Sequence, residues 1–347
     1  GYESNLNAAG VNNAAFGTAT LKSNATGNNN AAFGSGALFS NVSGSFNTGI
    51  GNGALTSNTT GGRNVAVGES ASHENTIGAG NVSVGSQASY SNTSGNNNSS
   101  MGSRALFNNI AGLNNTAIGS DVLFNSTTSD NTGVGFSSIN SATTGFRNTA
   151  LGSRSGQNIT TGSYNTALGA NAYSTSNYSN SAAIGDASVI SADNQIRLGD
   201  ASVTSIGGFA NWTNVSDKRF KKNIQENVPG LAFITKLKPV TYSLDLNAIH
   251  SYLKTPSEIR KPETETDKKQ EIQTGFIAQE VEQAAQETGF AFSGVDKPKN
   301  NEDFYGLRYA EFVVPLVKAV QEQQEMIEKL QLKIQQLEER LNNQGKK

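Results

Sequence analysis

Ser216 and Lys221, a serine and a lysine five positions apart, are the residues of this chain best suited to chemistry. A hydroxyl is a weak nucleophile until a base removes its proton. A lysine can be that base where burial or neighbouring cations favour its neutral form. Lys218, Arg219 and Lys222 lie next to Lys221 in the sequence and would act in this direction. Because serine–lysine pairs are a known variant of the serine hydrolase arrangement, the spacing is compatible with acyl transfer.

A simpler interpretation accounts for the same residues. A Ser-Asp pair before a charged run is typical of a helix N-cap or a turn, and the lysines are typical of a solvated surface. Spacing alone favours this interpretation over catalysis. The composition of the chain, however, changes at Ser216, from a repetitive Gly/Asn/Ser-rich part to a charged, aperiodic one. The pair therefore lies at a domain boundary.

The segment 216–224 reads Ser-Asp-Lys-Arg-Phe-Lys-Lys-Asn-Ile and resembles the opening motif of the S74 peptidase family. This family comprises the C-terminal intramolecular chaperone domains of phage tail fibres, tailspikes and related surface proteins. Two further motifs follow in the family's order, at Thr274–Val281 and Tyr309–Leu316. The resemblance covers residues 212–340.

The resemblance implies that this domain helps a fibrous trimer to fold and then cuts the bond before its own first serine. The scissile bond would be Val215–Ser216, with Ser216 as the nucleophile and Lys221 as the base. Three further members of the motif are taken as supporting residues: Asp217, Arg219 and Asn223.

The first 200 residues are an internal repeat. Units such as Asn64-Val65-Ala66-Val67-Gly68 close on glycines at 17, 34, 51, 68, 85, 102, 119, 135, 152, 169 and 185, which are 17 residues apart except for two spacings of 16. Disordered low-complexity sequence does not hold such a period, so the repeat predicts a solenoid.

Each unit predicts a coil of two short strands and two turns. The first strand alternates small and large side chains, which suits a narrow interior and an outer surface. A leucine four residues after the glycine, as in Leu38 and Leu55, predicts the second strand. Asn and Gly between the strands tolerate positive φ, and asparagines stacked from coil to coil can form hydrogen-bonded ladders.

The repeat resembles the heads of trimeric autotransporter adhesins, although its period is longer than theirs. The resemblance implies a left-handed parallel β-roll with three chains side by side. The sequence after residue 190 resembles the neck that follows such heads, and Trp212 is interpreted as a packing residue. Exposed aromatic side chains would serve adhesion or fill the interface between chains; the candidates are Phe16, Phe33, Tyr90, Phe107 and Phe124.

We therefore expect a mainly β solenoid head, 1–190, and a neck and linker, 191–215. An α+β chaperone domain at 216–311 and a coiled-coil helix at 312–343 follow. Within the chaperone domain, 233–244 predicts a short helix, a turn and a strand, and 275–287 a strand end running into a helix. A further short strand is expected at 305–309, and the Lys/Glu/Thr/Pro-rich stretch 254–271 is predicted to be a solvated loop.

The last helix carries apolar residues at alternating spacings of three and four, interrupted by Gln323. This pattern predicts a coiled coil, and the alternative is an amphipathic helix packed on its own domain. β-Branched residues at a and leucine at d favour two strands, whereas the resemblance implies three. The seam consists of Val313, Leu316, Val320, Gln323, Ile327, Leu330, Ile334, Leu337 and Leu341.

Composition excludes several other classes of function. A formal charge of −2 gives no electrostatic basis for nucleic-acid binding, and the absence of cysteine excludes thiolate chemistry. No apolar run is long enough to predict a membrane span. His73 and His250 have no ligand partner close in sequence, so neither a metal nor a cofactor is predicted.

Two functions are compatible with these features. The chain is either a trimeric fibre that matures by cutting itself, or a purely structural trimeric adhesin whose C-terminal domain never cuts. Either would be extracellular, on a phage tail or a bacterial surface, with a host receptor or glycan as the ligand of the head. The repeats hold too few acidic residues for a glycan-cleaving enzyme.

Overall fold

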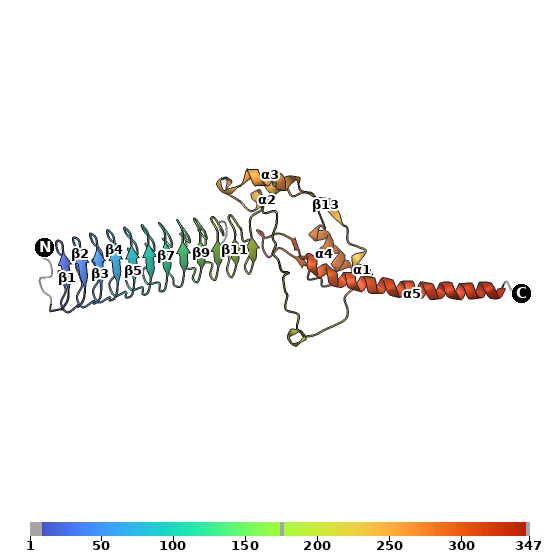
Figure 1. The fold of residues 1–347 in the computed structure, drawn as a ribbon, viewed down its shortest axis with the longest axis horizontal. Coiled ribbons are helices and arrows are strands. Elements are labelled where there is room, and N and C mark those ends of the chain that lie inside the picture. The colour runs from blue at the N-terminus through green and yellow to red at the C-terminus, as the bar shows by residue number, and fades with distance from the viewer. Residues whose placement is uncertain (1–8, 174–176, 345–347) are drawn as a thin grey trace. The chain divides into compact units, whose positions relative to one another are not determined.

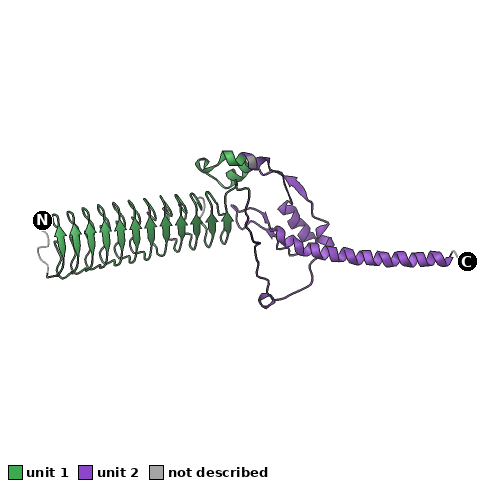
Figure 2. Cartoon of the chain, viewed as in Figure 1, with its two compact units in different colours: residues 1–204, 246–265 green, residues 205–245, 266–347 purple. Residues whose placement is uncertain are grey.

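The computed structural model describes residues 9–173 and 177–344 (Figure 1). The first eight residues of the predicted head lie outside the described residues. The chain divides into two compact units (Figure 2). Unit 1 contains residues 1–204 and 246–265, and unit 2 contains residues 205–245 and 266–347.

Unit 1 is built on a parallel β-solenoid, as the repeat predicts. Each coil contributes one three-residue strand to a twelve-stranded sheet in sequence order, visible as the row of arrows in Figure 1. The last strand lies in the segment interpreted as the neck. The strands are β1 (Ala14–Phe16), β2 (Ala31–Phe33), β3 (Thr48–Ile50), β4 (Val65–Val67), β5 (Val82–Val84), β6 (Ser99–Met101), β7 (Thr116–Ile118), β8 (Thr132–Val134), β9 (Thr149–Leu151), β10 (Thr166–Leu168), β11 (Ala182–Ile184) and β12 (Ile196–Leu198).

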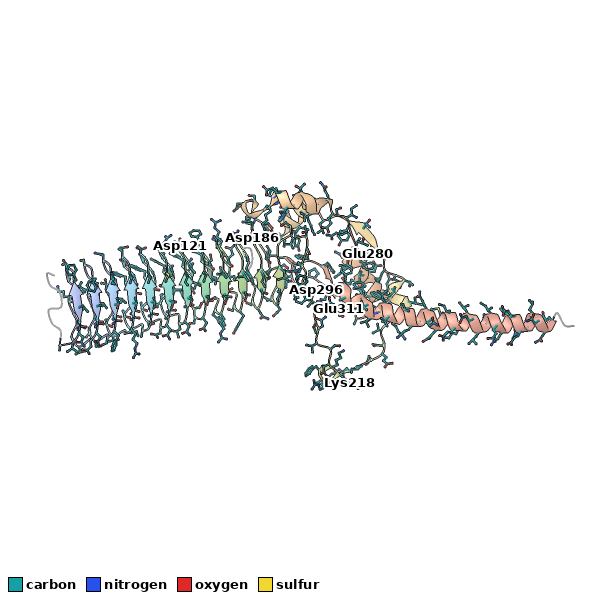
Figure 3. The ribbon with its side chains drawn as sticks, in the orientation of Figure 1. Asp121, Asp186, Lys218, Glu280, Asp296 and Glu311 are labelled. Atoms are coloured by element: carbon teal, nitrogen blue, oxygen red, sulfur yellow. The ribbon has the colours of Figure 1, made fainter. Side chains whose placement is uncertain are left out.

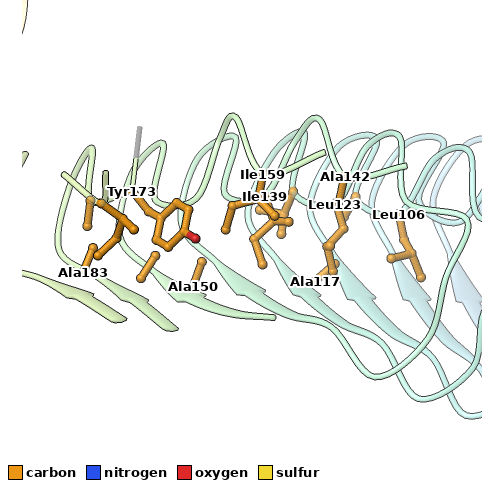
Figure 4. Close-up of a cluster of buried hydrophobic side chains, with 14 residues drawn as sticks. Leu106, Ala117, Leu123, Ile139, Ala142, Ala150, Ile159, Tyr173 and Ala183 are labelled. Atoms are coloured by element: carbon orange, nitrogen blue, oxygen red, sulfur yellow. The ribbon is translucent and has the colours of Figure 1, made fainter. Parts of the chain in front are cut away.

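The interior of the solenoid is a single narrow column of small and branched side chains. The middle residue of each strand points inward, and Ala66 and Ala117 are fully buried there. Leu106 and Leu123 lie opposite, also fully buried, in the cluster that Figure 4 shows. The predicted alternation of small interior and large exterior residues along the strand is confirmed.

In two successive coils that lack the inward leucine, a pair of serines takes its place. Ser72 Oγ donates a hydrogen bond to Ser83 Oγ at 2.7 Å. In the next coil Ser89 Oγ and Ser100 Oγ are 2.9 Å apart and share a hydrogen bond. All four side chains are buried, so each hydroxyl replaces a lost apolar contact with a bond that a buried polar group requires.

The predicted second strand is wrong. The wall that carries the leucines consists of turns, and the backbone of Leu38 and Leu55 is left-handed, with φ of 52° and 55°. This conformation costs a non-glycine residue about 1–2 kcal/mol, whereas burying a leucine contributes about 1.5–3 kcal/mol. The apolar pattern correctly marked burial at these positions, but burial does not fix φ.

The periodic glycines are required by the close stacking of coils. Gly51 has a φ of +134°, and a Cβ atom there would lie 2.3 Å from the carbonyl oxygen of Gly68 in the next coil. No side chain fits at that distance. The same relation recurs at Gly68, where a Cβ would lie 2.5 Å from the oxygen of Gly85.

Asparagine ladders join the coils along their buried turns, as predicted. Asn58 Nδ2 donates to Asn41 Oδ1 at 2.8 Å and to the carbonyl of Gly61 at 2.9 Å. Asn75 Nδ2 in turn donates to Asn58 Oδ1 at 2.7 Å. A second ladder precedes the strands, where the backbone N–H of each asparagine donates to the side chain of the previous one.

Unit 2 is a small α+β domain with a long C-terminal helix. Its core is aromatic and centres on the buried Phe233. The helix, strand and strand-to-helix predictions for 233–244, 275–287 and 305–309 are confirmed. The elements are α1 (Leu231–Ile234), β13 (Val240–Tyr242), β14 (Gln273–Gly275), α4 (Ala278–Glu287), β15 (Val295–Asp296), β16 (Gly306–Leu307) and α5 (Val313–Gln344), with short 3-10 helices at Lys218–Phe220 and Tyr309–Phe312.

The stretch 254–271, predicted to be a solvated loop, is largely structured. It contains a 3-10 helix, Ser257–Ile259, and α3, Pro262–Gln270, and follows α2, Leu246–Tyr252. Glu265 is buried and paired with Arg260, whose guanidinium donates to its carboxylate at 2.6 Å. The composition indicated exposure because it is charged, but a buried ion pair satisfies these charges internally.

Helix α5 has two different surfaces. Its first turns bury Pro315 and Ala319 against unit 2, and Glu322 accepts a hydrogen bond from the backbone N–H of Leu231 at 2.7 Å. The apolar seam lies on another surface and is exposed, including Ile327 and Leu330. The alternative of a seam packed on its own domain is therefore wrong for these residues.

Asn58→Ala is expected to lower the free energy of unfolding by roughly 1–3 kcal/mol, because it removes the hydrogen bond that the buried Asn41 Oδ1 accepts and one of the two side-chain hydrogen bonds that the Gly61 carbonyl accepts. Thermal unfolding followed by circular dichroism measures the effect. Asn52→Ala, on the exposed surface of the same coil, is the matched control and should leave the midpoint almost unchanged. Equal midpoints for the two variants would contradict a stabilising role of the ladder.

Candidate functional site

The predicted nucleophile and base lie in contact. Lys221 Nζ donates a hydrogen bond to Ser216 Oγ at 2.8 Å. The 3-10 helix Lys218–Phe220 separates the two residues and reverses the chain, and the backbone N–H of Lys221 donates to the carbonyl of Lys218 at 3.1 Å. A proton can pass between a hydroxyl and an amine at this distance. The five-residue spacing thus corresponds to one tight turn.

Asp217 and Arg219 hold this turn closed. Asp217 is the N-cap of the 3-10 helix, and its carboxylate accepts from the backbone N–H of Arg219 at 2.8 Å. The Arg219 side chain donates to both carboxylate oxygens, from Nε to Oδ1 at 3.1 Å and from Nη2 to Oδ2 at 2.7 Å. These hydrogen bonds lower the pKa of Asp217, so the cap stays ionised at neutral pH. The simpler interpretation as a capped turn is therefore correct for Asp217, and it coexists with the Ser–Lys contact.

Asn223 ends the motif with a backbone reversal. Its φ is +54°, in the left-handed region that asparagine tolerates better than most residues. Of the five motif residues predicted to matter, four therefore make or hold the turn around Ser216 and the fifth redirects the chain after it.

The loop that carries the motif is exposed, and large apolar side chains on it are exposed beside the charged ones. Ser216 and Lys221 are both exposed, Val215 is 83% exposed and Trp212 is 86% exposed. Figure 3 shows Lys218 at the far end of this loop, well away from Glu280 and Glu311. Trp212 does not pack on its own chain, so the expected packing role is not fulfilled within one copy.

The second and third motifs pack together and form the core of unit 2. Phe276 stacks on Phe312, with ring centroids 5.3 Å apart, and its backbone N–H donates to Tyr309 Oη at 3.1 Å. Glycine at position 275 leaves room for this hydrogen bond, because a Cβ would lie 2.3 Å from the hydroxyl oxygen and would displace the Tyr309 side chain. Sequence reasoning placed Gly275 and Tyr309 in these motifs but predicted no contact between them. The aromatic residues in both motifs, Phe276, Tyr309 and Phe312, were the available signal.

The two histidines lie in different surroundings. His73 stacks on Tyr90 at the start of a column of rings that continues through Phe107 and Phe124. His250 is buried in α2, with Nε2 3.1 Å from the carboxylate of Glu265. Among the residues that the structure describes, no group of three or more His, Cys, Asp or Glu side chains is placed to hold a metal ion.

None of the helices in the described ranges is long and apolar enough to cross a membrane.

A comparison with known protein families gives a match to part of the chain. Residues 216–290 match the family model of peptidase S74, described as the chaperone of endosialidase. The match begins at Ser216 and includes the first two motifs, while the third lies beyond it. No curated protein and no solved structure matches the chain. Residues 216–290, which follow a β-solenoid of parallel coils in the sequence, are therefore similar to the peptidase S74 chaperone family.

Proposed function

We propose that this chain is a trimeric surface or tail fibre that cuts itself between Val215 and Ser216. The observation that carries the proposal is the 2.8 Å contact between Ser216 Oγ and Lys221 Nζ. It is supported by the family match, which begins at the same serine. The segment acts as an intramolecular chaperone, and the protein is an enzyme only toward itself.

The chemistry follows from the position of Ser216 directly after the scissile bond. Neutral Lys221 takes the proton of Oγ, and Oγ attacks the carbonyl carbon of Val215. The carbon–nitrogen bond breaks, the Ser216 nitrogen takes a proton from the Lys221 ammonium, and an ester joins Val215 to Ser216 Oγ. Water then hydrolyses the ester, releasing the Val215 carboxylate and restoring the hydroxyl. Asp217 and Arg219 maintain the turn that holds the two reacting side chains together.

Two exposed apolar surfaces support a parallel oligomer. The third residue of each strand faces outward, and these residues stack in register as one stripe along the sheet, including Phe16, Phe33 and Ile50. A second copy of the chain in parallel carries an apolar residue at the same interval, so the two stripes match coil by coil. The exposed seam of α5 is the second apolar surface, and the same seam on a parallel copy of the helix would match it. A trimer agrees with the resemblance of the head, whereas the seam rule alone favours two strands.

The same surfaces also support the second candidate, a structural trimer that is never cut. Its specific support is the Asp217 cap, which explains the Ser-Asp pair without catalysis. In either case we place the protein outside the cell, on a phage tail or a bacterial surface, with a receptor or glycan bound by the head.

Ser216→Ala is expected to give a folded, uncut chain, because it removes the nucleophile and only one exposed hydroxyl. Denaturing electrophoresis distinguishes the outcomes. Cleavage of the 36.3 kDa chain gives a C-terminal piece of 132 residues, about 14 kDa, and an N-terminal piece of about 22 kDa. Ser205→Ala, on the exposed chain eleven residues upstream, is the control and should still be cut. Fragments from Ser216→Ala would exclude Ser216 as the nucleophile.

Lys221→Ala is expected to slow cleavage by at least ~100-fold, the usual contribution of a general base. Lys222→Ala removes the same charge from the adjacent position and should cut at nearly the normal rate, since Lys221 supplies the Nζ that contacts Ser216. The rate is measured as the fraction cut against time after refolding. If Lys222→Ala were slow and Lys221→Ala normal, the base would be Lys222 and its assignment to Lys221 would be wrong.

Cleavage is expected to wait for assembly, because a partner chain would cover the exposed loop and favour the neutral form of the base. Ile327→Asp with Leu330→Asp, both on the seam, should leave an uncut and poorly folded chain. Leu332→Asp with Gln335→Asp adds the same charge off the seam and is the control. Light scattering measures the mass of the assembly, and denaturing electrophoresis measures the fraction of chains that are cut. Efficient cutting by a monomeric seam variant would separate assembly from chemistry.

A further inference from the structure

Residues 246–265 lie within the S74-matching segment of the sequence but belong to the same compact unit as the solenoid. They fold into α2 and the 3-10 helix Ser257–Ile259, with Leu246 fully buried. Arg260 donates to Asn247 Oδ1 at 2.9 Å and to the buried Glu265 at 2.6 Å. Hydrogen bonds from Arg260 thus hold the parts of this insertion, residues 246–265, together.

Lys261 joins this insertion to the last two coils of the solenoid. Its Nζ lies 2.8 Å from Asp200 Oδ2 and 3.1 Å from Asp186 Oδ2. Asp186 follows β11 and Asp200 follows β12, so one ammonium bridges two successive coils. Figure 3 labels Asp186 at this end of the solenoid.

Asp200 is held in place by burial and by further hydrogen bonds. The Asp200 side chain is only 10% exposed, and it also accepts from the backbone N–H and hydroxyl of Ser202 at 2.9 and 2.6 Å. Burial opposes ionisation, but the hydrogen bonds from Lys261 and Ser202 outweigh it and lower the pKa of Asp200. The carboxylate is therefore ionised at neutral pH, where Lys261 is an ammonium.

The end of the solenoid needs such a cover. β12 is the last strand in the order of the sheet, so its outer edge has no further coil on it among the described residues. Open edges and terminal repeats of solenoids expose unpaired backbone groups and interior side chains, and capping segments normally protect them.

We propose that residues 246–265 are a cap for the terminal coils, held by Lys261, and that this cap keeps the C-terminal fragment attached to the head after the chain is cut. The retention rests on the proposed cleavage at Val215–Ser216, because only then do cap and coils belong to different chains. The partner that the end of the head recognises is thus a segment of its own sequence, which presents the ammonium group of Lys261 to the two aspartates. Cleavage of the peptide bond and dissociation of the C-terminal fragment from the head are then two separate steps.

The test makes the cut independently of self-cleavage. A full-length Ser216→Ala chain receives a recognition sequence for a site-specific protease between Gly207 and Gly208, where an added side chain would meet no atom within 4 Å. After digestion, size-exclusion chromatography under native conditions and denaturing electrophoresis of the fractions show whether the two fragments elute together. Failure of the proposed self-cleavage leaves this measurement intact.

The cap predicts that the digested parent chain and its Lys261→Arg variant elute as complexes. Lys261→Glu places a carboxylate between Asp186 and Asp200 and should weaken the association by at least ~30-fold. Lys222→Glu makes the same charge change on the exposed motif loop and should retain the complex. Circular dichroism before digestion checks that each variant is folded. Separation of the parent fragments, or retention in Lys261→Glu equal to that of the parent, would overturn the proposal.

Discussion

The spacing between neighbouring coils is the constraint on which this molecule depends. Backbone hydrogen bonds between strands bring successive coils so close that a Cβ at Gly51 would lie within 2.3 Å of the next coil. Glycine is therefore required at that corner, and asparagine is favoured where a buried turn must bond both to itself and to its neighbour. The interior that remains is thin, with small residues on one wall and one larger side chain on the other, usually leucine or isoleucine and in one coil Tyr173. Low hydrophobicity and high Gly and Asn content are consequences of this geometry.

A domain with such a thin core obtains its stability from contacts repeated between neighbouring coils. Unit 2 instead depends on contacts between residues far apart in the sequence. Its aromatic core joins Phe233, Phe276 and Phe312 from distant parts of the sequence. The motif around Ser216 belongs to neither core. It is a capped turn on an exposed loop, in which Asp217 and Arg219 fix the local geometry. The contact between Ser216 and Lys221 is therefore formed by local hydrogen bonds and does not depend on the packing of either core.

The sequence predicted most of what is periodic or local. The glycine period, the asparagine ladders and the Ser216–Lys221 contact each follow from a few residues whose spacing has a direct physical meaning. The wall bearing Leu38 was mistaken for a strand, because an apolar residue reports burial and not backbone dihedral angles. The insertion containing Glu265 was mistaken for a solvated loop, because composition cannot show that Arg260 and Glu265 pair with each other. Lys261 was missed for the same reason: its two carboxylate partners are more than 60 residues away in sequence.

The two short coils, in which the closing glycines are separated by 16 residues instead of 17, have a consequence for how such a chain can change over generations. The strand register is continuous across both, from Thr116 to Thr132 and from Thr166 to Ala182, so a residue was lost without disturbing the sheet. The turns therefore absorb small changes in length, while the contacts between coils are made only with immediate neighbours. Duplication or deletion of one whole coil would preserve every kind of contact and alter the reach of the head by about 4.8 Å. Length is then a trait that can vary in equal steps, independently of the machinery at the C-terminal end.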